Sequence, residues 1–170
     1  MLCPVCGEPN YPGEDLCVFC VFDLSSADLP FSNNQVEGSL IADPVSVLDP
    51  RRPVTVLATA PLGDAIAAMI AERVGAVLVV GPTGQLVGIL TERDFLTRVA
   101  GSPGYTVLPV RQFMTRDPEA VSPTDPLAFA LAKMDLGGYR HLPVTVGGRP
   151  VGVISVRDIL RHVMRVCNDG

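Results

Sequence analysis

Aromatic residues and histidines are scarce in this sequence. Its 170 residues include no tryptophan, only 5% aromatic residues and two histidines. The apolar share of 48% comes mainly from valine, alanine, leucine and isoleucine, which is typical of a globular mixture of helices and strands. The sequence has only two histidines and no recognisable combination of a nucleophile with a general base, so we do not expect an enzyme.

Long apolar runs are also missing. A helix that spans a bilayer needs about 20 apolar residues, whereas a run such as AVLVV at 76–80 has the length of a strand. The opening residues, MLCPVCG, lack the basic region and apolar stretch of a secretory signal. We therefore predict a cytoplasmic protein without a membrane partner, in a reducing environment.

Basic residues are absent from the first part of the chain. Residues 1–50 contain eight Asp or Glu and no Lys, Arg or His, whereas residues 51–170 contain thirteen basic and ten acidic residues. The formal net charge of the whole chain is -5. Because an acidic segment repels phosphate backbones, we expect no nucleic-acid partner.

The body of the sequence contains an internal repeat. The segment VGILTERDFL at 87–96 matches VGVISVRDIL at 151–160, and TAPLGDAIAAM at 59–69 matches TDPLAFALAKM at 124–134. The first pair is offset by 64 positions and the second by 65, so a single deletion relates the two copies. A duplication of this length indicates two similar structural units.

Each copy predicts the order strand, helix, strand, strand, helix, which places the body in the α/β class. The first copy has an extended piece at 54–57, an amphipathic helix around 62–70 and two strands joined by a turn containing glycine. The corresponding extended piece of the second copy is expected at 120–122. A further helix is expected to begin just after Thr91 in the first copy and after Ser155 in the second.

This order resembles the CBS domain, named after cystathionine β-synthase. The resemblance rests on GxxTxxD in the first copy, GxxSxxD in the second and RHLPV at 140–144, and it covers about residues 44–165. It implies a tandem CBS pair that binds adenine nucleotides or related adenosyl ligands in clefts between the two repeats. It also implies a homodimer and a regulatory role toward another protein.

The repeated motif has two interpretations. A Thr or Ser followed three residues later by an acid is a helix capping box, which stabilises a helix without any ligand. A helix N-terminus also attracts phosphate, and capping does not explain an arginine in the first turn of both copies. The preceding glycine allows another group to approach the backbone, or it marks a strand bend. The candidate nucleotide-binding residues of the two motifs are Gly88, Thr91, Arg93, Asp94, Gly152, Ser155, Arg157 and Asp158.

The resemblance assigns roles to these residues. It implies that the two aspartates accept hydrogen bonds from ribose hydroxyls and that the Thr or Ser contacts ribose or phosphate. Aliphatic strand residues would hold the adenine between them. We extend this assignment to the two motif arginines as phosphate partners, although exposed arginines are more often solvated or in surface ion pairs.

The two copies differ at the start of one strand. Arg140 and His141 in the second copy align with Gly75 and Ala76 in the first. By resemblance, basic residues at this place face phosphates, and the alternative is a solvated pair or a bond to a loop carbonyl. If they face phosphate, the two clefts are unequal, and we expect one ligand per chain rather than two.

Four cysteines form two CxxC pairs near the N-terminus, in CPVCGEPNYPGEDLCVFC at 3–20. Each pair can present two sulfurs to one tetrahedral Zn²⁺, and without a secretory signal zinc is preferred to disulfides. A redox dithiol, an iron site of the rubredoxin type and thiols without metal are the alternatives. The pattern resembles a short zinc ribbon, with Asn10 in the ribbon's usual place and Val21 where the ribbon has glycine. The expected ligands of one structural zinc ion per chain are Cys3, Cys6, Cys17 and Cys20.

Together these patterns predict five segments and a function. The segments are a zinc ribbon at 1–22, an acidic linker at 23–43, a first CBS repeat at 44–100, a connecting loop at 101–108 and a second CBS repeat at 109–166. The expected function is regulatory sensing of AMP, ADP, ATP or another adenosyl ligand, with the ribbon as an interaction element for an unknown regulated protein. The alternative is a ligand-free scaffold whose repeats serve only for dimerisation.

Overall fold

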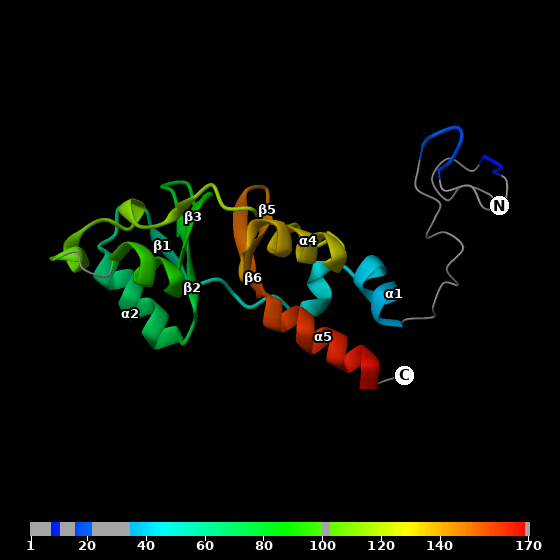
Figure 1. Ribbon diagram of the computed structural model, residues 1–170. Coiled ribbons are helices and arrows are strands. Elements are labelled where there is room, and N and C mark those ends of the chain that lie inside the picture. Colours follow the sequence, from blue (N-terminus) through cyan, green and yellow to red (C-terminus); the bar gives the residue numbers. More distant parts are fainter. Residues whose placement is uncertain (1–7, 11–15, 22–34, 100–102, 169–170) are drawn as a thin grey trace. The chain divides into compact units, whose positions relative to one another are not determined.

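The computed structural model of the protein describes residues 8–10, 16–21, 35–99 and 103–168 (Figure 1). The chain divides after Asn34 into two compact units, and each is described separately below. The larger unit, which begins at residue 35, contains both copies of the repeat. Within the described residues, no helix is long and apolar enough to cross a membrane.

The first repeat forms a four-stranded sheet with helices on one side (Figure 1). Strand β1 pairs in parallel with β2, β2 pairs antiparallel with β3, and β3 pairs antiparallel with a short β4. A continuous helical segment, made of α3 and η2, follows β3 directly. The bounds are β1 Thr55–Leu57, α2 Leu62–Glu72, β2 Ala76–Val80, β3 Leu86–Thr91, α3 Glu92–Asp94, η2 Phe95–Val99 and β4 Thr115–Arg116.

The second repeat has the same order of elements, except that its first strand is reduced to a single bridge. Val121 pairs in parallel with Val144, and its N–H donates to the carbonyl of Pro143 at 3.0 Å. Prolines at 118 and 123 flank this segment, and proline cannot donate to a strand ladder, which limits its length. The remaining bounds are α4 Leu127–Gly137, β5 His141–Val146, β6 Arg149–Ser155 and α5 Val156–Asn168.

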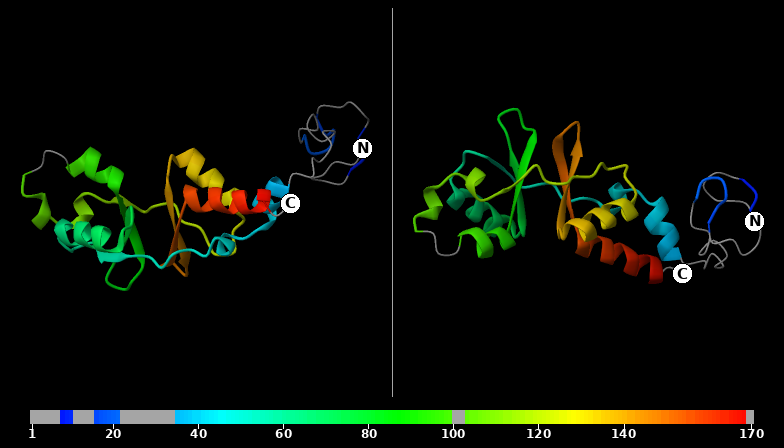
Figure 2. Two further views of the ribbon diagram at one scale, coloured as in Figure 1. Left: turned by 90° about the horizontal axis from the view of Figure 1, so that it is seen from below. Right: turned by 45° about the horizontal axis from the view of Figure 1, so that its top comes forward.

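The sheets of the two repeats face each other, and the helices lie on their outer sides (Figure 2). A small apolar cluster lies between the sheets, where Val153 of β6 packs against buried Ala76, Leu78 and Ile89 of the first repeat. Burial of apolar surface stabilises such an interface. The two repeats therefore form one continuous body.

The first residues of the two repeats are exchanged between their cores. Fully buried Val45 belongs to the core of the second repeat, and fully buried Val110 belongs to the core of the first. The Val45 N–H donates to the backbone carbonyl of Asp125 at 2.8 Å, and the Val110 N–H donates to that of Ala60 at 2.9 Å. Each repeat is therefore completed by the first residues of the other one. Three short 3-10 turns lie in these segments and in the connecting loop: η1 Val45–Leu48, η3 Tyr105–Val107 and η4 Val110–Gln112.

The last part of the expected linker is a helix, α1 (Gln35–Ala42), which packs against α4 and α5. Leu40 contributes to the core of the second repeat, and a polar cluster joins the end of α1 to α5. There the Nε2 atom of buried His162 lies 2.7 Å from the Ser39 hydroxyl and 3.0 Å from the Asp43 carboxylate. Hydrogen bonds from Ser39 first and His162 second outweigh burial and lower the pKa of Asp43. Residues 35–42 therefore form a helix that packs on the second repeat, through Leu40 in the apolar core and Ser39 beside His162.

Candidate functional site

A cleft of about 1140 Å³ lies between the two repeats. This volume slightly exceeds the roughly 300–1,000 Å³ range that is usual for small-molecule sites. One wall comes from residues 52–54 before β1, from α2, from the start of β2 and from Glu92 and Phe95 after β3. The other comes from the start of β5, from β6 with Arg51 paired to it, and from the first turns of α5. Apolar side chains line it beside charged ones. The apolar lining includes Val54, Ile66, Met69, Ala76, Val153 and Val156.

The SVRD motif of the second repeat lies in this cleft. Ser155, at the end of β6, donates to one oxygen of the Asp158 carboxylate through both its N–H, at 2.8 Å, and its hydroxyl, at 2.7 Å. The other oxygen of Asp158 lies 3.2 Å from the Arg161 guanidinium. Ser155, Arg157 and Asp158 all line the cleft. The capping bonds therefore hold the carboxylate of Asp158 at the cleft wall.

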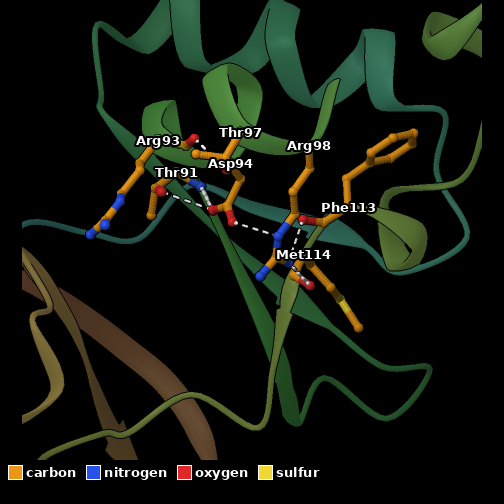
Figure 3. Close-up of polar contacts among 7 residues, drawn as sticks. All are labelled: Thr91, Arg93, Asp94, Thr97, Arg98, Phe113 and Met114. Carbon is orange, nitrogen blue, oxygen red and sulfur yellow. Dashed lines mark hydrogen bonds and ion pairs between the residues drawn. The ribbon is translucent and has the colours of Figure 1, made fainter. Parts of the chain in front are cut away.

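The TERD motif of the first repeat has the same capping bonds (Figure 3), but of its four residues Glu92 alone lines this cleft. One oxygen of Asp94 accepts from the Thr91 N–H at 2.9 Å and from its hydroxyl at 2.8 Å. The other lies 3.6 Å from Nε of Arg98, whose guanidinium also donates to the carbonyls of Phe113 and Met114 at 3.1 and 2.9 Å. The Asp94 carboxylate is therefore buried and enclosed by protein groups. Arg93 points away from this cluster (Figure 3).

The motif glycines are both close to the chain itself. A side chain at Gly152 would place its Cβ 2.6 Å from Cβ of Pro50, and one at Gly88 would place it 3.1 Å from the Thr115 carbonyl oxygen. Gly88 pairs with Arg116 in the sheet. Both glycines are buried, and neither lines the cleft. The close approach that glycine permits is made here by the exchanged segments of the chain.

Arg140 and His141 lie in the cleft at the start of β5, as part of the second wall. The aligned Gly75 lies opposite them, because a Cβ on Gly75 would be 3.6 Å from Cε1 of His141 and 3.5 Å from the Glu92 carboxylate. Burial lowers the pKa of His141, and this effect and the nearby arginines outweigh Glu92 and Asp158, which raise it. His141 is therefore mostly neutral near pH 7.

Sequence reasoning missed four further arginines that line the same cleft. Arg51 and Arg52 precede β1, Arg73 ends α2, and Arg161 lies one turn after Asp158. The signal for the first two was present, since the consecutive arginines are the first basic residues of the chain. Arg73 and Arg161 carried no such signal, because the cleft that they line is formed by segments from distant parts of the sequence.

The cysteine pairs lie only partly within the described residues, because Cys3 and Cys6 are outside them. The Sγ atom of buried Cys17 accepts a hydrogen bond from the Asn10 amide at 3.4 Å, and Asn10 Oδ1 accepts from the Val18 N–H at 3.0 Å. Burial raises the pKa of the Cys17 thiol, but hydrogen bonds from Cys20, Phe19 and Asn10 outweigh burial and lower it to about 6. Among the described residues, no three His, Cys, Asp or Glu side chains gather as a metal site.

The second CxxC turn has the backbone conformation that glycine favours. Val21, which stands where the ribbon has glycine, has φ of 60°, and its N–H donates to the Cys17 carbonyl at 2.8 Å. A β-branched residue at positive φ is a rare exception. The replacement of glycine by valine therefore leaves the turn's left-handed conformation in place.

The body is thus a tandem α/β repeat with a charged cleft between its copies. A family model for the CBS domain matches residues 45–101 and 110–165, and the chain belongs to the CBS-domain family. This match confirms the CBS pair expected from the repeat. It lies entirely within the larger unit and does not include residues 1–44.

Related proteins agree with this assignment. A CBS domain-containing protein of Arabidopsis thaliana is 40% identical over 101 residues, which are 57% of this chain and 18% of that protein. An uncharacterized 17.7 kDa protein of Acidianus ambivalens is 32% identical over 106 residues, 62% of this chain and 63% of that protein. The chain therefore spans less than two thirds of the length of these relatives.

Solved structures with the same fold include two informative ones. A CBS-domain containing protein from Agrobacterium tumefaciens is 31% identical, with a TM-score of 0.63 over 71% of this chain and 93% of that one. A CBS domain protein from Pyrobaculum aerophilum, complexed with AMP, is 29% identical, with a TM-score of 0.64 over 72% of this chain and 98% of that one. The mixed α/β fold is that of CBS pairs.

Proposed function

We propose that the protein is a regulatory module that binds an adenine nucleotide in the cleft between its two repeats. The observation that carries this proposal is the position of Asp158, whose carboxylate is held at the cleft wall by Ser155 beside the apolar lining. The AMP complex of the related Pyrobaculum aerophilum protein supports the same ligand class. We expect one occupied cleft per chain.

The cleft offers each part of a nucleotide a suitable partner. Aliphatic side chains such as Val54 and Val153 provide apolar surface for the adenine. Asp158 can accept hydrogen bonds from the ribose hydroxyls, since a carboxylate has acceptor capacity beyond the two bonds from Ser155. Arg157 and Arg140 provide positive charge for phosphate. Among the candidates from the sequence, this proposal uses the second motif and does not use Asp94.

Thermal unfolding with AMP, ADP, ATP, S-adenosylmethionine and NAD tests this proposal. A ligand at about 100 times its dissociation constant should stabilise the fold by roughly 2.7 kcal/mol, which is a measurable rise in melting temperature. Asp158→Ala should reduce this stabilisation to about 0.4–1.4 kcal/mol at the same ligand concentration. Asp135→Ala, an exposed aspartate on α4 outside the cleft, should preserve it. No rise with any ligand would favour the ligand-free scaffold, and a rise that Asp158→Ala leaves unchanged would place the site elsewhere.

We also propose that the four cysteines of residues 1–22 bind one structural zinc ion. The support is the paired CxxC spacing, the left-handed turn at Val21 and the hydrogen bond from Asn10 to the Cys17 sulfur. Amide N–H groups that donate to a zinc-bound sulfur orient the ligand. Four cysteines complete a tetrahedral site, so this zinc would stabilise the ribbon and take no part in chemistry.

Elemental analysis of protein purified without chelators tests the zinc proposal. We expect about one zinc per chain, with loss of metal in Cys17→Ser. Cys167→Ser is the matched control, because Cys167 is an exposed thiol near the end of α5 and should leave the metal content unchanged. Zinc-free protein, or iron in its place, would contradict this proposal.

A homodimer in the cytoplasm that regulates a separate protein completes the proposal. Its support is the exposed apolar side chains Ile70 on α2 and Leu160 and Met164 on α5, which a second copy would bury. Light scattering should report twice the chain mass, 18.0 kDa for one chain. A monomer at micromolar concentration would contradict the dimer, and Leu160→Glu should reduce a true dimer to monomer.

A further inference from the structure

The cleft between the repeats has a large excess of positive charge. Six arginines and two carboxylates line it, which leaves a formal charge of four positive units if His141 is neutral. Arg161 pairs with Asp158, but the other five arginines form no ion pair with any residue that the structure describes. Like charges gathered in a partly enclosed cleft repel one another and favour an anionic ligand. The five arginines are Arg51, Arg52, Arg73, Arg140 and Arg157.

One of these arginines has a backbone conformation that glycine would adopt more easily. Arg73 ends α2 with φ of 53°, in the left-handed region. The aligned residue of the second repeat, Gly138, ends α4 in the same conformation with φ of 62°. Only glycine adopts this conformation without a steric penalty. The second repeat therefore shows that folding alone is satisfied by glycine at this helix end, whereas the first repeat has an arginine that lines the cleft.

The arginines lie on both walls of the cleft. Arg52 and Arg73 belong to the wall formed by α2 and the segment before β1, whereas Arg140, Arg157 and Arg161 belong to the wall formed by β5, β6 and α5. Arg51 joins this second wall, because its backbone pairs with Val153 of β6. A single phosphate carries about two negative charges and is small compared with a cleft of about 1140 Å³. A chain of phosphates is longer and carries more charge, so it can contact arginines of both walls.

We propose that the cleft prefers a nucleoside triphosphate to a nucleoside monophosphate or an uncharged adenosyl compound. This inference rests on the proposed function and specifies its ligand class. The triphosphate chain extends between the two walls, where its negative charge compensates the unpaired arginines. Arg73 contributes to this phosphate subsite, although the sequence motifs of the repeat do not include it.

Calorimetric titration with adenosine, AMP, ADP, ATP and inorganic tripolyphosphate, without divalent cations, tests the preference. We expect ATP to bind at least tenfold more tightly than AMP, with a steeper loss of affinity on addition of salt, since each charged contact is weakened by screening. Arg73→Gly should fold at least as well as the parent and should reduce the ATP-to-AMP affinity ratio about fivefold to tenfold. Arg111→Gln, an exposed arginine outside the cleft, should leave the ratio unchanged.

The possible outcomes separate this inference from the proposed function. If AMP or adenosine binds as tightly as ATP, the triphosphate preference is wrong and the adenosyl site stands. If only tripolyphosphate binds, and Arg73→Gly weakens it, the polyphosphate subsite stands and the adenosyl function is wrong. If none of the five compounds binds, both are wrong. If Arg73→Gly leaves the ratio of ATP affinity to AMP affinity unchanged, Arg73 is not part of the phosphate subsite.

Discussion

The two repeats have the same capping motif but use its carboxylate differently. In the first repeat, Arg98 encloses Asp94 and links it to the carbonyls of an exchanged segment (Figure 3). The equivalent position in the second repeat, 64 residues later, is His162, which contacts Ser39 and Asp43 instead. Asp158 is therefore left at the cleft wall.

This difference separates two roles that the sequence motif combines. The hydrogen bonds from Thr91 or Ser155 are present in both copies, so they belong to the folding of the strand-to-helix junction. Of the two carboxylates, Asp158 lines the cleft between the repeats and Asp94 does not. In this protein, the residue four positions after the motif aspartate differs between the copies: Arg98 contacts Asp94, whereas His162 contacts Ser39 and Asp43.

The largest expected effect concerns the cores, where the two repeats are alike. Leu62 and Leu127 are aligned and fully buried, so Leu62→Ala and Leu127→Ala should each lower the free energy of unfolding by about 2–5 kcal/mol. Because Val45 and Val110 are exchanged between the cores, each variant should unfold in one transition. Denaturant unfolding, followed by two independent spectroscopic probes, measures the free energy of unfolding and the number of transitions. Two separate transitions, only one of them shifted, would show that the repeats unfold independently.

The next effect distinguishes the two carboxylates. Asp94→Ala should cost about 1–3 kcal/mol of stability, because it removes the cap and the partner of Arg98 from a buried place. Asp158→Ala should cost about 1 kcal/mol, because its side chain is more exposed, at 21% against 10% for Asp94.

Nucleotide affinity should change in the opposite order. Asp158→Ala should weaken binding by roughly tenfold to a hundredfold, which corresponds to about 1.5–3 kcal/mol for hydrogen bonds to a charged group. Asp94→Ala should leave the affinity of the folded protein within about twofold, since Asp94 does not line the cleft. Titration at a temperature where both variants are folded measures this. Equal losses of affinity in both variants would mean that both copies bind ligand.

Much of this comparison could be predicted from the sequence, because local patterns carry it. The offset between the copies predicted the order of elements, and the helices that begin after Thr91 and Ser155 follow from the capping motif. The unequal basic residues Arg140 and His141 already suggested that the clefts differ. Their position in the cleft agrees with that expectation, which remains a prediction about binding.

The rest depended on contacts between distant residues. No local pattern indicates that Val45 packs with the second repeat or that Arg98 encloses Asp94. The left-handed end of α2 was equally hidden, since a helix that ends at Arg73 instead of glycine has no sequence signal. Exchange of segments and closure of a carboxylate are properties of tertiary packing, which a single sequence does not display.

A smaller effect concerns pH and the basic pair of the second repeat. Burial holds the pKa of His141 below its ordinary value of 6.5, so the free cleft has a neutral imidazole near pH 7. A bound phosphate favours the protonated form and raises this pKa, so binding takes up a proton. Nucleotide affinity should therefore increase several-fold as pH falls from 8 through the pKa of the complex.

Titrations at several pH values in parallel with His141→Asn measure this effect. The variant retains a polar side chain and reports the ligand's own phosphate titration, which has a pKa of about 6. The difference between the two affinity profiles is the contribution of His141. If the affinities of the parent and the variant change with pH in parallel, His141 is excluded from the phosphate site.

The same lowered pKa of His141 makes the fold less stable as pH falls below about 6.5, because the unfolded chain binds the proton more tightly.

The smallest effect comes from the helix ends, where the repeats differ by arginine and glycine. Gly138→Arg should lower stability by about 1 kcal/mol, because it places a side chain in the left-handed region at the end of α4. Arg73→Gly should raise stability by a similar amount at the end of α2. The double variant should therefore match the parent in stability while it lacks the arginine of the cleft. If Arg73→Gly instead destabilises the protein, Arg73 contributes to folding, and its unfavourable backbone conformation no longer indicates a ligand.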